Sequence, residues 1–185
     1  MIKKAFILIL SFLVVSCVNK NRTKIIQSKF NLKQDLYSFL SKMEENDTIR
    51  MKVNLSLCMV NHYEEILLIR HNQKNYITGK AQQTFIETEI KTLEQRELKE
   101  VADSLTFESF FKYLNQNNIE SYSNPFLTII YKNDTVKFLS SGVSETGAKI
   151  EYYSNVMRKI YPENEFYNVV EVKAPPEPMA VPDIN

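Results

Sequence analysis

The strongest strand signal in the chain lies between Ile49 and Met59. The odd positions of this run are Ile, Met, Val, Leu, Leu and Met, whereas the even positions are Arg, Lys, Asn, Ser and Cys. Successive side chains of a β-strand point to opposite faces, so this period of two predicts a strand with one face on the core and one toward solvent or a partner. A slip of one residue would bury Arg50 and Lys52, and the register is therefore firmly specified.

The rest of the chain divides into further strands and helices. Asn61 and His62 are predicted to form a turn, and Gly142 to Gly147 a loop. Residues 84–91 fit either a strand or a helix that opens with a capping box of Thr84 and Glu87; their β-branched residues favour the strand. The other expected strands are residues 65–71, 76–78, 126–131, 135–139 and 166–172. The expected helices are residues 32–43 capped by Asn31, 92–105 capped by Thr92, 107–114 and 150–160.

This order of elements predicts an α+β fold. Strands follow one another too closely for the crossover helices that a parallel sheet needs. We therefore expect an antiparallel meander sheet of about five to seven strands, with about three helices packed on one face. The expected organisation is a leader (residues 1–16), a tether (17–28), one globular domain (29–172) and an exposed tail (173–185) that holds four of the six prolines.

Charge and composition exclude some classes of function. The chain has 23 Lys and Arg against 22 Asp and Glu, and its basic residues are scattered among acidic ones. No global field attracts nucleic acid, which makes a nucleic-acid partner a poor expectation. Only three glycines are present, which argues against glycine-rich phosphate loops, and no cofactor is expected.

The amino-terminal residues have the order of a secretory signal peptide. Lys3 and Lys4 precede an apolar run from Ala5 to Val15, which is too short to cross a bilayer as a helix. The run ends in Val14-Val15-Ser16-Cys17, which resembles the lipobox of bacterial lipoproteins. That resemblance covers the leader alone and implies cleavage between Ser16 and Cys17 and acylation of Cys17.

Acylation would anchor the mature chain to a membrane, because two or more acyl chains hold a protein durably at a bilayer. In the sorting rule of one group of bacterial lipoproteins, an aspartate after the acylated cysteine favours the inner membrane. Val18 stands there, so the resemblance implies an outer-membrane protein facing the periplasm.

Cys58, His62 and His71 are the residues that suit a metal or a nucleophilic reaction. A hairpin could bring all three together, and zinc uses these atom types. A reactive thiol would also need a positive neighbour in a cleft. No zinc-site spacing is present, so a packed thiol and two surface histidines are the simpler interpretation.

The sequence thus favours an anchored, non-catalytic domain that binds something, with a protein partner first and an immunity or inhibitor protein as one version. The first alternative is a metal- or thiol-dependent enzyme centred on Cys58, His62 and His71. The second is a carrier of lipid or of a small ligand, which needs an apolar cavity between sheet and helices.

Overall fold

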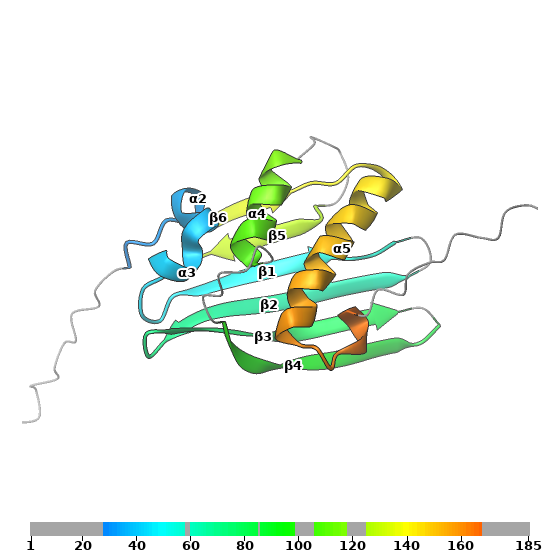
Figure 1. Cartoon of the computed structure of the whole chain (residues 1–185), viewed down its shortest axis with the longest axis horizontal. Helices are drawn as coiled ribbons and strands as arrows, with labels where there is room; N and C mark the ends of the chain where they lie inside the picture. Colours follow the sequence, from blue (N-terminus) through cyan, green and yellow to red (C-terminus); the bar gives the residue numbers. More distant parts are fainter. Residues whose placement is uncertain (1–27, 58–59, 85, 99–105, 118–124, 168–185) are drawn as a thin grey trace, which may run out of the picture.

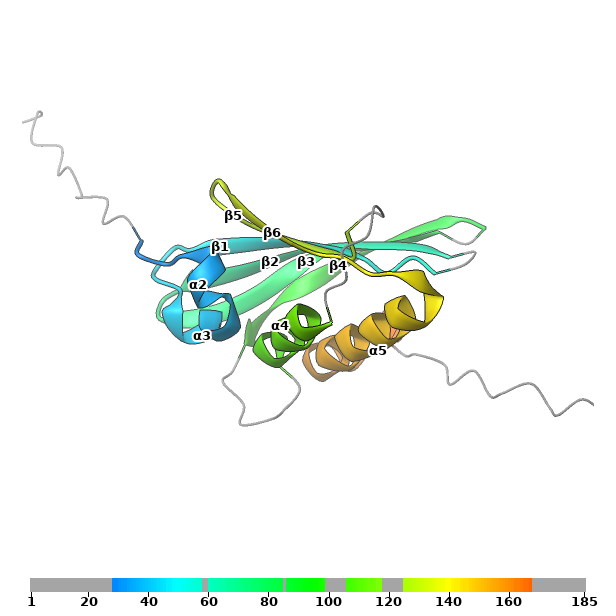
Figure 2. The ribbon, with the colours of Figure 1, turned by 90° about the horizontal axis from the view of Figure 1, so that it is seen from above.

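A six-stranded antiparallel sheet forms one layer of the fold, and helices form the other (Figure 1). The computed structural model describes residues 28–57, 60–84, 86–98, 106–117 and 125–167. The helices of this part all lie on one face of the sheet, and none of them covers the opposite face (Figure 2). We call that opposite surface the open face. The predicted α+β class, antiparallel pairing and one-sided helix layer are all confirmed.

The sheet has the strand order β4-β3-β2-β1-β5-β6. Its strands are β1 (Thr48–Asn54), β2 (Asn61–His71), β3 (Lys74–Thr84), β4 (Thr88–Leu98), β5 (Leu127–Tyr131) and β6 (Asp134–Phe138). In β1, Ile49, Met51 and Val53 are buried, while Arg50 and Lys52 are exposed. The predicted alternation therefore holds along β1 and sets which residues reach the open face.

The helical layer begins with three short pieces and continues with two longer helices. The elements are α2 (Leu32–Asp35), η1 (Leu36–Ser38), α3 (Phe39–Lys42), α4 (Phe107–Gln116), α5 (Gly142–Ile160) and η2 (Glu165–Tyr167). The side chain of Asn31 caps α2 as predicted, accepting from the backbone N–H groups of Lys33 and Gln34. Tyr161 ends α5 just before Pro162, which is where the sequence places the end of the last helix.

Aromatic side chains fill the space between the two layers. Phe110 and Phe111 of α4 and Tyr153 of α5 are fully buried, and their rings contact one another and Phe39. Burying an aromatic side chain of this kind contributes about 1.5–3 kcal/mol. This packing holds the helices on one side of the sheet and leaves the open face available.

The predicted helix at residues 92–105 is wrong over its described part, because Thr88 to Leu98 form β4. Thr92 pairs with Lys80 of β3 instead of capping a helix. Local capping signals contribute about 1 kcal/mol, and the ladder of cross-strand bonds to β3 outweighs them. The favoured strand at residues 84–91 is likewise split, since β3 ends at Thr84 and β4 begins at Thr88.

Two predicted irregular segments are also wrong. Asn61 and His62 open β2 instead of forming a turn. Gly142 to Gly147 form the first turns of α5, where the Glu145 carboxylate accepts from the backbone and the hydroxyl of Ser141. Glu145 also contacts the buried ammonium of Lys149 one turn later. These side-chain contacts stabilise the first turns of α5, where the two glycines have a low helix propensity.

Candidate functional site

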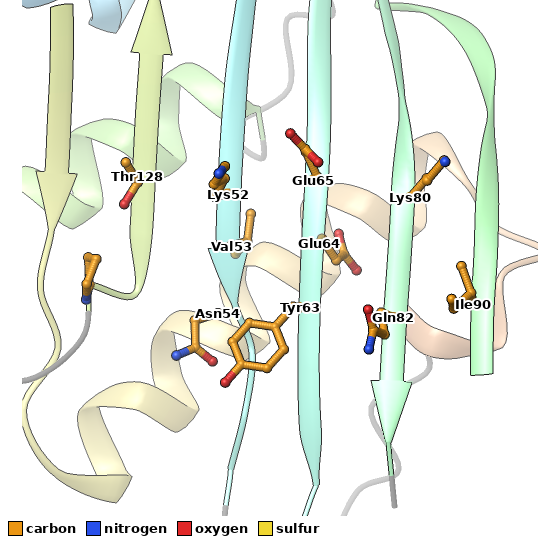
Figure 3. A pocket seen from close by; sticks show the side chains of 11 residues that line it. Lys52, Val53, Asn54, Tyr63, Glu64, Glu65, Lys80, Gln82, Ile90 and Thr128 are labelled. Atoms are coloured by element: carbon orange, nitrogen blue, oxygen red, sulfur yellow. The ribbon is translucent and has the colours of Figure 1, made fainter. Parts of the chain in front are cut away.

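A shallow hollow lies on the open face, at the end of the sheet where β1 finishes and β2 begins. Its volume is about 550 Å³. The residues that line it come from the five neighbouring strands β4, β3, β2, β1 and β5 and from the segment before β5 (Figure 3). They are Lys52, Val53, Asn54, Tyr63, Glu64, Glu65, Lys80, Gln82, Ile90, Pro125 and Thr128.

Strand register arranges the hollow in two rows. Asn54, Tyr63, Gln82 and Ile90 are successive cross-strand partners in the first row. Tyr63 is 48% exposed between the amides of Asn54 and Gln82, and Ile90, beyond Gln82, is 63% exposed. Aromatic side chains such as Tyr63 are enriched at protein interfaces.

The second row carries positive charge. It crosses all six strands in the order Lys137, Thr128, Lys52, Glu65, Lys80 and Thr92, of which Lys137 and Thr92 lie beyond the residues that line the hollow. Glu65 is the one acidic member of this row, and its Oε1 lies 3.4 Å from Nε of Arg50 on the same face. Among the described residues no carboxylate lies within 4.0 Å of the Lys52 or Lys80 ammonium. These two lysines are therefore free to meet anionic groups of a ligand.

A buried polar cluster lies directly behind the hollow, on the helix side of β2. His62 and Glu64 are 8% and 3% exposed, and His62 Nε2 lies 3.1 Å from Glu64 Oε1. The hydroxyl of Tyr153 in α5 donates to Glu64 Oε2 at 2.5 Å. Burial, followed by the charge of Glu64, raises the pKa of Tyr153 and Tyr167, so both phenols stay protonated at neutral pH.

The Glu64 side chain has no exposed surface, and its hydrogen bond from Tyr153 connects β2 to α5 across the two layers of the fold. Within the described residues, His62 Nε2 and Glu64 Oε1 have no hydrogen-bond partner. Glu64 and Glu65 are adjacent in the sequence, yet Glu64 is buried and Glu65 is exposed on the open face. Strand alternation distinguishes the two, because His62 and Glu64 lie at the same alternate positions of β2 as the buried Ile66 and Leu68.

The structure does not bring the two histidines together. His62 is buried at the start of β2, whereas His71 is exposed at its end, where Nδ1 lies 3.1 Å from Glu45 Oε1. The nine residue steps of strand from one histidine to the other span about 30 Å. Cys58 lies outside the described residues, as do Ser16 and Cys17 of the predicted cleavage site.

Catalytic features are not indicated in the part of the chain that the structure describes. No group of three or more His, Cys, Asp or Glu residues there is placed to hold a metal ion. Within the same residues, no helix combines the length and the apolar character that crossing a bilayer requires. Comparison of the chain with family models, curated proteins and solved structures gave no match.

Proposed function

We propose that this protein is a lipid-anchored envelope protein whose domain binds a protein partner at the open face and catalyses no reaction. The observation that carries the proposal is the hollow, where Tyr63 and Ile90 offer apolar surface beside the ammonium groups of Lys52 and Lys80. Aromatic residues beside polar groups are the usual composition of a protein interface. A secreted toxin that the anchored domain neutralises is one concrete form of such a partner.

The place of the tether supports this assignment. Ser28, the first described residue, hydrogen-bonds to Asp47 just before β1 begins, whereas the hollow lies beside Asn54 at the end of β1 (Figure 1). These two ends of β1 are about 20 Å apart. A domain held through residues 17–28 would thus be attached at one end of the sheet and carry the hollow at the other.

A partner with a negative surface fits the hollow best. Complementary charge accelerates encounter and selects among partners. The carrier alternative places its ligand between sheet and helices, where Phe39, Phe110, Phe111 and Tyr153 pack against one another. The observed hollow lies on the other face, which favours a partner that docks from outside.

Photo-crosslinking in intact cells tests the proposal. A benzophenone amino acid in place of Tyr63 keeps an aromatic ring in the hollow and should capture one defined partner. The same amino acid in place of Glu151, which is exposed on α5, serves as the control. Capture of the same proteins from both positions, or of none from Tyr63, would refute the assignment.

A charge-reversal pair tests the electrostatic part. The double variant K52E/K80E should lose at least about ten-fold in captured partner, because reversal converts attraction into repulsion at two contacts. The double variant K33E/K112E makes the same charge change at exposed positions of α2 and α4 and should leave capture unchanged. Equal loss in both variants would show that only net charge matters.

Anchoring is tested by intact mass of the protein purified from membranes. The expected chain begins at Cys17 and carries the added mass of its acyl chains, and the variant Cys17→Ala lacks that mass. An unmodified wild-type protein in the aqueous fraction would contradict the lipid anchor while leaving the binding surface untouched.

A further inference from the structure

The described chain ends at the same end of the sheet as the hollow, on the helix side. The ring of Phe166 in η2 contacts that of His62, with 5.4 Å between centroids, and Lys91 Nζ lies 4.5 Å from the centre of the Phe166 ring. The residues next to His62 and Lys91 are Tyr63 and Ile90, which line the hollow. Only the thickness of the sheet therefore separates η2 from the hollow.

The chain has an unobstructed route from η2 to the hollow. β4 is an outer strand of the sheet, so a segment that leaves Tyr167 near Lys91 can pass round this edge without crossing another described strand. Residues 168–185 follow Tyr167. Glu177 lies ten positions after Tyr167, and ten extended residues span about 33 Å, which is enough to pass round one outer strand.

The chemistry of residues 173–185 complements that of the hollow. This segment begins with Lys173 and holds Pro175, Pro176, Pro178 and Pro182, with Glu177 among these prolines and Asp183 directly after the last of them. Proline-rich segments favour polyproline II, which leaves backbone carbonyls free and docks on aromatic surfaces.

The hollow offers a matching group for each feature. The ring of Tyr63 suits packing against proline, the amides of Asn54 and Gln82 can donate to backbone carbonyls, and the ammonium groups of Lys52 and Lys80 can meet carboxylates. Pairing with Glu177 and Asp183 would supply the carboxylates that Lys52 and Lys80 lack within the described residues.

We infer that residues 173–185 occupy the hollow of their own chain and shield it until a partner displaces them. The regulatory part of this inference rests on the proposed function, because it assigns the segment and the partner to one surface. A short tether keeps the local concentration of the segment high, so that even weak contacts fill the site. The segment would thus set a threshold that a genuine partner must exceed.

Intramolecular crosslinking of the purified mature chain tests occupancy. With the benzophenone amino acid in place of Tyr63, irradiation in dilute solution should join position 63 to a peptide within residues 173–185, identified by mass spectrometry. With the probe in place of Glu151, that product should be absent. A mixture of ¹⁴N- and ¹⁵N-labelled chains should give only products of uniform isotope, and mixed products would overturn the inference in favour of a second copy.

A charge swap tests recognition. The variant E177K/D183K should lower the intramolecular crosslink about five-fold, because each exposed charge contact changes an equilibrium by about 1.5- to 5-fold. Adding K52E/K80E to that variant should restore the crosslink. Equal crosslinking in the wild type and in E177K/D183K, or no restoration by the swap, would overturn the inference.

The regulatory part has a separate readout in cells. Capture of the partner by the probe at position 63 should rise severalfold in the E177K/D183K chain, because the competing segment is weakened. A fall in capture would mean that the segment itself contacts the partner, which overturns shielding. Partner capture without any intramolecular product would support the proposed function and refute occupancy of the hollow by residues 173–185. An intramolecular product without partner capture would support that occupancy and refute the proposed function.

Discussion

The contact between Tyr153 and Glu64 supports a quantitative prediction about stability. The Tyr153 hydroxyl donates to Glu64 Oε2 at 2.5 Å, and the Glu64 side chain has no exposed surface. A hydrogen bond to a charged group contributes about 1.5–3 kcal/mol, and a buried acceptor that loses its donor cannot turn to water. Tyr153→Phe keeps the packing of the ring and should lower the free energy of unfolding by about 2 kcal/mol.

The partner substitution shows whether the loss comes from this contact. Glu64→Gln retains a side-chain oxygen that can accept from the Tyr153 hydroxyl. In this variant the hydrogen bond joins two neutral groups and contributes about 1 kcal/mol. The two substitutions should therefore be non-additive, with a coupling energy of about 1 kcal/mol. Urea unfolding followed by far-UV circular dichroism, with m-values compared among all four proteins, measures it.

A matched tyrosine provides the control. No hydrogen bond from the Tyr113 hydroxyl is found within the described residues, and its ring stacks on Tyr152 in the same layer. Tyr113→Phe should change the free energy of unfolding by less than about 0.5 kcal/mol. A loss of stability in Tyr153→Phe no larger than in this control, or additivity in the double variant, would refute a stabilising contact between Tyr153 and Glu64.

Two further predictions follow from the same fold. A Cβ at Gly79 would meet the backbone oxygen of Glu65 at 2.4 Å, so Gly79→Ala should destabilise the domain by about 2 kcal/mol. A Cβ at Gly147 meets nothing within 4 Å, so Gly147→Ala should stabilise α5 by about 0.5–1 kcal/mol. Thermal melts in which Gly79→Ala is the more stable of the two variants would contradict this pair of predictions. Because the folded pKa of Tyr153 is raised above 10.0, its contribution to stability is complete below pH 10 and is lost as the pH rises beyond it; a flat stability profile from pH 9 to 12 would exclude this contribution.

The fold class could be predicted because its signals are local. The alternation in β1 and the apolar faces of α4 and the second half of α5 each lie within one element. β4 escaped prediction because it is an outer strand, in which Leu93 is the one residue buried on the core side. Because β4 has no run of apolar residues on its core side, the capping signal at Thr92 favours a helix when the sequence is taken alone. Pairing with β3 makes the segment a strand.

The buried cluster escaped prediction for a different reason. His62 and Glu64 occupy inward positions of β2, but polar residues at such positions read as solvated ones until their partners are known. Those partners are Tyr153, which donates to Glu64, and Phe166, whose ring contacts that of His62, about ninety residues or more further along the chain. Contacts at this separation depend on how α5 and η2 pack on the sheet, and no local pattern encodes them.

The charge of the open face depends on register in the same way. The chain as a whole has a formal charge of +1, yet strand pairing places Lys137, Lys52 and Lys80 in one row. Thr128 stands between Lys137 and Lys52, and Glu65 stands between Lys52 and Lys80, so no two lysines of this row lie on neighbouring strands. The single carboxylate is shared with Arg50, so it offsets only part of the positive charge. Lys52 and Lys80 thus keep a net positive charge on the open face, and this is the charge that the anionic partner we propose would meet.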